Sequence, residues 1–202
     1  MIDYGMGNLA SVRRALEECG SDVIVSKDAD DIEDANAIIL PGVGAFSEGM
    51  QRLHDMGWGK ALTKAVLEEK TPILGICLGM QLLADWGYEH NKTKGLGYIA
   101  GEVVKLELQN TRIPHIGWNE VSYKEENLLL EHISNGTDFY FVHSYHFIPQ
   151  NQEAILGTTT HGFEFVSIVQ NNNIFGTQFH PEKSSKNGFV LLRNFLKFSE
   201  SC

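Results

Sequence analysis

A short segment of the chain, Thr71–Gln81, has the form of an apolar strand that runs through a tight turn into a helix. The turn places Cys77 between Gly75 and Gly79, in the pattern Gly-x-Cys-x-Gly. A nucleophile at such a strand-to-helix elbow needs small neighbours, because the turn leaves no room for a Cβ and the substrate must approach closely. The helix N-terminus would also favour the thiolate form of Cys77. The pattern predicts a nucleophile, although a free cysteine that only packs in a core strand fits the elbow equally well.

A candidate base follows a second strand. The residues Asn172–Phe179 read as a polar turn and a strand, which ends in His180-Pro181-Glu182. Proline disfavours the helical region for the residue before it, so we expect an extended tripeptide in which His180 and Glu182 project to the same side. A carboxylate beside an imidazole fixes its tautomer and orientation, as an activated thiol requires. A solvated loop is the alternative reading of this tripeptide, and the Cys77 elbow makes it the weaker one.

The first half of the chain alternates strands and helices, which predicts a parallel sheet covered by helices. We expect strands at Met1–Asp3, Asp22–Val25, Ala37–Leu40 and the elbow, and helices at Leu9–Cys19, Met50–Leu53 and Lys60–Glu68.

After Gly95 the pattern changes to short strands separated by turns, and a helix at Asn187–Phe198 closes the chain. The expected strands are Gly101–Leu106, Asn119–Tyr123, Asp138–His143, Ala154–Thr160, Phe165–Gln170 and Ile174–Phe179.

Composition is typical of a small cytosolic enzyme. The three cysteines are far apart and form no CxxC pair, which argues for a reducing compartment and against a disulfide framework. The net charge of −10 disfavours a nucleic-acid partner, and no apolar run approaches membrane-spanning length. No metal site is expected, since His143 and His146 of a strand-like segment would point to opposite faces without a third ligand.

Three motifs together resemble those of the class I (triad) glutamine amidotransferases. They are PGVG at 41–44, GICLGMQ at 75–81 and HPE at 180–182. Within that class, DYGMGN at 3–8, PHIGWN at 114–119 and FVHSY at 141–145 resemble the glutaminase subunits of imidazole glycerol phosphate synthase. The resemblance covers essentially the whole chain. It implies one glutamine amidotransferase domain over residues 1–202, an α/β flavodoxin-like sandwich with a mostly parallel central sheet and an antiparallel extension.

The resemblance also implies a reaction without a cofactor. Cys77 would attack the side-chain carboxamide of glutamine, and His180, oriented by Glu182, would protonate the departing ammonia and then activate water. The Leu78 backbone N–H is expected to stabilise the oxyanion, together with a second donor near Val43 or Gly44. Four residues are implied to hold the ends of glutamine: Gly44, Gln81, Ser144 and Tyr145.

Ser144 and Tyr145 could equally be ordinary strand residues. The implied partner is a (β/α)₈ cyclase of the HisF type, which uses the ammonia to convert PRFAR into imidazole glycerol phosphate and AICAR in histidine biosynthesis. The positions that resemble partner contacts are Asn8, Trp118 and Lys183, although a solvated lysine is the ordinary reading of Lys183.

Other functions remain open from the sequence alone. Similar glutaminases also serve synthetases that aminate surface sugars, and a non-catalytic subunit could keep the same fold. The residues Gly5–Ala10 fit the dinucleotide-binding pattern G-x-G-x-x-G/A, with Asp28 near the distance expected of a ribose-binding acid. An oxidoreductase of that kind would leave the elbow and His-Pro-Glu unexplained. Only Met1 and Ile2 precede Asp3, so either the first strand is short or the chain starts further upstream.

Overall fold

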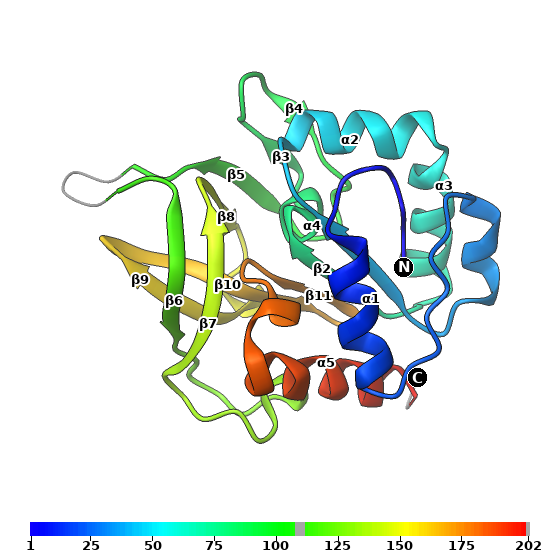
Figure 1. Ribbon diagram of the computed structural model, residues 1–202. Helices are drawn as coiled ribbons and strands as arrows, with labels where there is room; N and C mark the ends of the chain where they lie inside the picture. Colours follow the sequence, from blue (N-terminus) through cyan, green and yellow to red (C-terminus); the bar gives the residue numbers. More distant parts are fainter. Residues whose placement is uncertain (108–111, 201–202) are drawn as a thin grey trace.

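A five-stranded sheet forms the centre of the molecule (Figure 1). The structure, a computed structural model, describes residues 1–107 and 112–200. The strand order is β1-β2-β11-β10-β9, in which β1, β2 and β11 are parallel and β10 and β9 are antiparallel neighbours. The bounds are β1 (Ile38–Gly42), β2 (Ile73–Cys77), β9 (Ile155–His161), β10 (Phe163–Asn171) and β11 (Ile174–Thr177). The sheet therefore has a parallel part, formed by β1, β2 and β11, and an antiparallel extension, formed by β10 and β9, as expected.

Helices cover both faces of this sheet, because its central strands are buried on both sides. Successive residues of β1 and β2 contribute alternately to two apolar clusters, with Leu40 and Ile73 in one and Ile39 and Leu74 in the other. The first cluster includes the helices α2 (Phe46–Asp55), α3 (Trp58–Thr63) and α4 (Leu78–Leu82). The second includes α1 (Leu9–Glu18) and α5 (Ser185–Ser199). The result is the three-layered α/β sandwich expected from the sequence.

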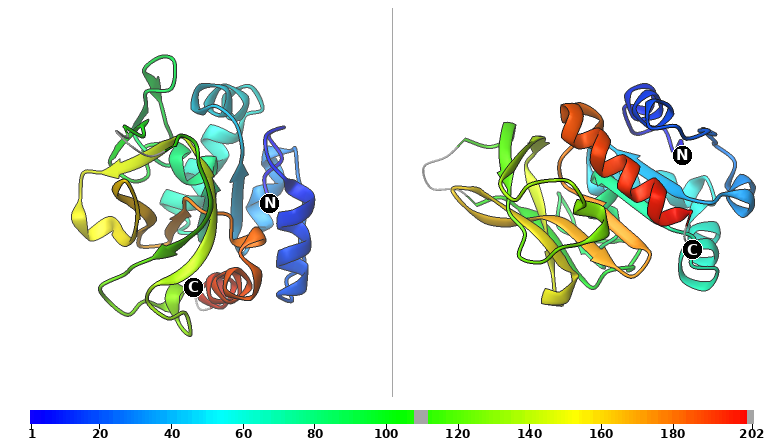
Figure 2. Two further views of the ribbon diagram at one scale, coloured as in Figure 1. Left: turned by 60° about the vertical axis from the view of Figure 1, so that its left-hand side comes forward. Right: turned by 90° about the horizontal axis from the view of Figure 1, so that it is seen from below.

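Two smaller sheets accompany the central sheet (Figure 1 and Figure 2): β4 of one lies beside α2, and β6 of the other lies beside β9. One has the order β4-β3-β5-β8 and the other pairs β6 with β7. Their bounds are β3 (Trp86–Gly87), β4 (Thr93–Lys94), β5 (Gly101–Lys105), β6 (His115–Val121), β7 (Thr137–His143) and β8 (Tyr145–Pro149). The chain passes from one small sheet to the other at Ser144, between β7 and β8.

Two of the expected strands are not formed as regular elements. Met1–Asp3 and Asp22–Val25 are reduced to a single parallel bridge between Ile2 and Ser26. The missing second strand also removes the geometry expected for dinucleotide binding, because no strand presents Asp28 at a sheet edge. The Asp28 side chain instead accepts a hydrogen bond from the Asp30 N–H and caps a 3-10 helix.

Most of the remaining elements agree with the sequence-based expectations to within a few residues. The helical stretches after β1 are longer than expected, and α3 continues into a π-helical turn at Lys64–Glu68. The strand expected at Ile174–Phe179 ends at Thr177, and β6 begins at His115 rather than at Asn119. The sequence pattern predicts no strand at β3, β4 or β8. In the described part of the chain, no helix is long and apolar enough to cross a membrane. Cys202 lies outside the described residues.

Candidate active site

Cys77 lies at the junction of β2 and α4 in a strained backbone conformation. Its φ is +54° and its ψ is −109°, a region that residues with a Cβ rarely adopt. A strained backbone conformation of this kind persists only where the surrounding structure holds it in place, and such residues are common at functional sites. The neighbouring glycines permit the turn: a Cβ on Gly75 would lie 2.6 Å from the Gly79 carbonyl oxygen, and one on Gly79 would overlap the Leu40 carbonyl. The elbow expected from the sequence is therefore present in the structure.

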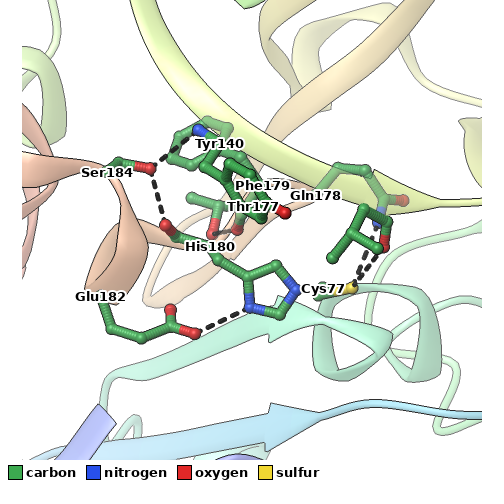
Figure 3. A network of polar contacts seen from close by, with 9 residues as sticks. Cys77, Tyr140, Thr177, Gln178, Phe179, His180, Glu182 and Ser184 are labelled. Carbon is green, nitrogen blue, oxygen red and sulfur yellow. Dashed lines mark hydrogen bonds and ion pairs between the residues drawn. The ribbon is translucent and has the colours of Figure 1, made fainter. Parts of the chain in front are cut away.

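The backbone of His180 is fixed against β7. Its N–H donates to the Tyr140 carbonyl at 2.9 Å. The Ser184 hydroxyl donates to the His180 carbonyl at 2.6 Å and accepts from the Tyr140 N–H at 3.0 Å (Figure 3). Since β11 runs parallel to β2, the segment after β11 emerges at the same sheet edge as the elbow. The sheet thereby brings His180 to Cys77 from a distant part of the sequence.

The extended conformation expected for His180-Pro181-Glu182 is wrong beyond its first residue. His180 is extended, with φ −98° and ψ 97°, but Pro181 starts a 3-10 helix that runs to Lys183. Proline suits the first position of a helix because it has no N–H to leave unpaired there. The turn still brings the side chains together, with His180 Nδ1 2.8 Å from Glu182 Oε1. Both side chains are almost completely buried.

The other ring nitrogen of His180, Nε2, is directed toward Cys77 (Figure 3). It is buried and has no hydrogen-bond partner. Burial by itself would lower the pKa of His180, but interactions with Cys77 and Glu182 outweigh it and raise the pKa to about 9. An imidazolium held between a carboxylate and a thiolate is the arrangement that activates a cysteine nucleophile.

The residues expected to form the oxyanion hole flank the elbow. Leu78 is the first residue of α4, where a backbone N–H has no acceptor within the helix. In the pairing of β1 with β2, Gly42 lies opposite Cys77, so Val43 and Gly44 follow β1 beside the nucleophile. Both are exposed, and Gly44 has a φ of +110°, which favours glycine.

The four residues expected to bind glutamine differ in exposure. Gly44 is exposed, Ser144 and Tyr145 are half-buried, and Gln81 is buried. The Gln81 side chain donates to the Tyr145 carbonyl at 3.0 Å. The structure therefore brings Gln81 and Tyr145 together.

A further acidic side chain, that of Glu89, lies beside the Gly44 turn and has no sequence pattern that marks it. The carboxylate of Glu89 accepts a hydrogen bond from the Phe46 N–H, directly after the Gly44 turn. Burial and then the charge of Glu89 raise the pKa of the Tyr145 hydroxyl, so this carboxylate faces the same region. Glu89 lies in an irregular segment of the sequence, and no local pattern marked it.

The expected partner positions are exposed at or near this edge. Trp118 is 54% exposed, and its ring meets that of Tyr140 edge to face. The Lys183 ammonium lies 5.9 Å from the centre of the same Tyr140 ring. Asn8 precedes α1, and the adjacent Gly7 lies against Pro41 of the candidate oxyanion loop.

The expectation that His143 and His146 point to opposite faces is wrong. Both rings lie near the ring of Phe165, at centroid distances of 5.0 and 6.3 Å, because the chain changes sheets at Ser144. Over residues 1–107 and 112–200, no three His, Cys, Asp or Glu side chains gather as a metal-binding set.

Comparison with known proteins identifies the class. The family described as glutamine amidotransferase class-I matches residues 1–198. A solved structure described as a glutamine amidotransferase superimposes with a TM-score of 0.78, covers 98% of this chain and 97% of its own, and is 18% identical, so it supports the fold alone. The chain therefore belongs to the class-I glutamine amidotransferases.

Two relatives define its place within that class. A protein from Methanococcus maripaludis named imidazole glycerol phosphate synthase subunit HisH 2 is 46% identical, over 98% of both chains. The subunit HisH of Moorella thermoacetica is 47% identical, over 96% of this chain and 92% of its own. With identities this high over nearly complete chains, the protein is a member of the HisH family.

Proposed function

We propose that the chain is the glutaminase subunit of an imidazole glycerol phosphate synthase and works as a single glutamine amidotransferase domain over residues 1–202. The observation that carries this proposal is the buried His180–Glu182 pair, whose free ring nitrogen is directed toward Cys77 on a strained elbow. A thiol, a base and an orienting carboxylate in this arrangement suit attack on a carboxamide.

In the first half of the reaction, the Cys77 thiolate forms a bond to the side-chain carbonyl carbon of glutamine. The resulting oxyanion accepts hydrogen bonds from the Leu78 N–H and from the loop at Val43 and Gly44. His180 then gives its Nε2 proton to the amide nitrogen, which leaves as ammonia while a glutamyl thioester remains.

In the second half, water attacks the thioester and gives its proton to His180 Nε2. The tetrahedral intermediate collapses, the carbon–sulfur bond breaks, and glutamate and the Cys77 thiolate are released. Glu182 keeps the imidazole oriented through both halves by its hydrogen bond to Nδ1.

The charged end of glutamine needs groups of both signs. The Glu89 carboxylate, facing Tyr145 and the Gly44 turn, is suited to receive the α-ammonium group. We assign Gly44, Gln81, Ser144 and Tyr145 to the remaining polar atoms of the substrate.

We assign the ammonia to a cyclase partner of the HisF type, which converts PRFAR into imidazole glycerol phosphate and AICAR. An exposed apolar surface supports a docked partner: Ile116 is 60% and Trp118 54% exposed on β6, and Val43 is 41% exposed beside the elbow. Asn8 and Lys183 would contribute polar contacts to the same interface. The free thiols of Cys19 and Cys77 suit a reducing cytoplasm.

The decisive experiment replaces the nucleophile. Cys77→Ala should abolish release of glutamate from glutamine, measured with the cyclase and PRFAR present, while the melting temperature stays within a few degrees of wild type. Cys19→Ala serves as the matched control and should retain turnover. Glutamate release by folded Cys77→Ala at the wild-type rate would contradict the proposal.

A further inference from the structure

We infer that Gln178 positions the nucleophile: its side-chain N–H donates to Cys77 Sγ. Gln81 holds Gln178 in this orientation, and a second run of hydrogen bonds, from Asn119 on β6 through His115 and His143, meets Gln81 at the Tyr145 carbonyl. This role rests on the proposed function of Cys77. The inference gives a positioning role to residues other than Cys77, His180 and Glu182.

The end of the chain at the sulfur is fixed by two contacts of one amide. Gln178 Nε2 lies 3.7 Å from Cys77 Sγ (Figure 3). Gln178 Oε1 accepts from Gln81 Nε2 at 2.9 Å. Because Gln81 offers an N–H, the oxygen of Gln178 must face Gln81 and its nitrogen must face the sulfur. Gln178 is completely buried, so water does not compete for this donor.

The Tyr145 carbonyl is the next link. It accepts from Gln81 Nε2 at 3.0 Å and from His143 Nδ1 at 2.8 Å. Gln81 therefore uses both of its N–H bonds, one on this carbonyl and one on Gln178. The position of the Tyr145 carbonyl consequently sets the orientation of Gln81 and, through it, that of Gln178.

The far end of the chain lies on β6. Asn119 Oδ1 accepts from the Glu120 N–H, and Asn119 Nδ2 donates to the Thr160 carbonyl at 2.9 Å. These two contacts fix the amide, so the second N–H of Nδ2 is directed at His115 Nε2, 3.2 Å away. His115 must then carry its proton on Nδ1, which lies 3.0 Å from His143 Nε2.

Both ends of the chain require the same tautomers. The contacts of Asn119 on β6 require His115 to donate from Nδ1 to His143 Nε2. Independently, the Tyr145 carbonyl can only accept, so His143 must donate to it from Nδ1 and accept at Nε2. Both imidazoles are thus neutral. Burial lowers the pKa of His115 to about 4 and that of His143 to about 3, in agreement with neutral rings at physiological pH.

The orientation of the Gln178 amide has a chemical consequence at Cys77. In the thiol form the sulfur donates to the Val142 carbonyl, 3.9 Å away. A fixed N–H from Gln178 favours the thiolate instead, because hydrogen bonds to a charged acceptor are stronger than those to a neutral one. Gln178 should therefore lower the pH at which Cys77 becomes reactive.

The test measures the pH dependence of alkylation of Cys77 by iodoacetamide in the full-length chain, with the label quantified on the Cys77 peptide. In Gln178→Leu the midpoint should rise by about one unit, which slows alkylation about ten-fold at pH values below it. Gln178→Glu keeps the shape of the side chain and the acceptor for Gln81 but loses the donor, so it should raise the midpoint at least as far.

The relay is tested at His143. His143→Phe should raise the midpoint, whereas His143→Asn, which restores a donor near the Nδ1 position, should return it toward wild type. His146→Phe is the matched control, since His146 is equally buried and its Nδ1 has no hydrogen-bond partner. Its midpoint should not move.

A wild-type midpoint in folded Gln178→Leu and Gln178→Glu, or in folded His143→Phe, would overturn the inference. Wild-type protein that alkylates at Cys77 but releases no glutamate from glutamine with the cyclase and PRFAR present would instead contradict the proposed function. The two failures are therefore distinguishable.

Discussion

At the scale of single residues, the candidate site contains two ionisable side chains whose burial costs desolvation free energy. His180 and Glu182 are both buried, and each is tolerated there because the other compensates it. The Glu182 Oε2 atom and the His180 Nε2 atom are left without partners. Buried polar atoms without partners are rare in folded proteins, and here Nε2 is the atom that must exchange protons with the substrate.

The carboxylate of Glu182 should orient His180 rather than transfer protons. We expect Glu182→Gln to lower glutamine turnover about 10²- to 10⁴-fold, and His180→Ala to lower it further because the base itself is gone. Steady-state glutamate release by both variants, with partner present, checks the order. A more damaging Glu182→Gln would show that the two roles are assigned wrongly.

The same variant makes a prediction about pH. Glu182 contributes to the raised pKa of His180, about 9, so its removal should lower that pKa. The alkaline limb of the turnover profile reports loss of the His180 proton and should therefore move to lower pH in Glu182→Gln. A limb that stays in place would remove Glu182 from this role.

At the scale of elements, the elbow depends on close approach of α4 to β1 and β2. Gly75 and Gly79 allow this approach, and either Cβ would meet backbone atoms that cannot move independently. Small residues at these two positions are therefore required by packing as well as by access of substrate to Cys77.

Gly79→Ala should destabilise the protein by at least about 2 kcal/mol, because the added Cβ would overlap the Leu40 carbonyl. Gly59→Ala is the matched control in helix α3, where a Cβ would have no neighbour within 4 Å. That change should be neutral or stabilise by up to about 1 kcal/mol, since alanine is the better helix former. Urea unfolding of both variants decides the matter, and equal effects would contradict the packing argument.

At the scale of the whole molecule, the elbow and the His180 turn lie at one edge of the central sheet. Trp118 on β6 is close to them, because its ring packs on Tyr140, whose carbonyl accepts from the His180 N–H. Ammonia released without an acceptor is wasted, so we expect the isolated chain to be slow and its partner to accelerate it. Lys183 directly follows the Glu182 turn and is exposed, so it is placed to sense a docked partner.

Lys183→Ala should reduce partner-stimulated glutamate release about five-fold or more, while the slow basal rate barely changes, because an interfacial contact can couple sites without dominating binding. The basal rate is measured without partner and the stimulated rate at saturating partner. Lys186→Ala, a change at an exposed lysine on α5, is the control and should leave stimulation intact. Equal stimulation in Lys183→Ala and wild type would make Lys183 an ordinary solvated lysine.

The buried histidines predict acid sensitivity of the whole fold. Burial lowers the pKa values of His115 and His146 to about 4 and that of His143 to about 3. Unfolded chains bind protons at these sites below about pH 6.5, so stability falls as the pH drops from about 6.5 toward 4. Between pH 7 and 5 the loss should reach at most about 2 kcal/mol for each histidine. Urea unfolding at both pH values measures it, and His146→Phe should show a smaller loss than wild type.

The sequence by itself determined the local chemistry of the elbow and the overall class of fold. Gly-x-Cys-x-Gly after an apolar strand specifies a tight turn into a helix, because only glycine fits beside the strands at Gly75 and Gly79. The alternation of strands and helices predicts a parallel sheet covered by helices, and the apolar face of the last helical segment predicts α5. These features depend on neighbours within one or two turns of the chain, which sequence patterns report directly.

Only the tertiary structure decided which distant groups meet. The strands predicted at Met1–Asp3 and Asp22–Val25 do not form, because the two segments pair through a single bridge. Local strand propensity does not report whether a segment finds a neighbouring strand in the fold. The His180 turn was expected to be extended, but packing of Ser184 against Tyr140 and the proline at position 181 made it a 3-10 helix. Glu89 and the chain from Asn119 to Gln178 carry no local signal at all. Their contacts join residues far apart in sequence, and the physical reason is that buried polar groups must find partners wherever the folded sheets bring them.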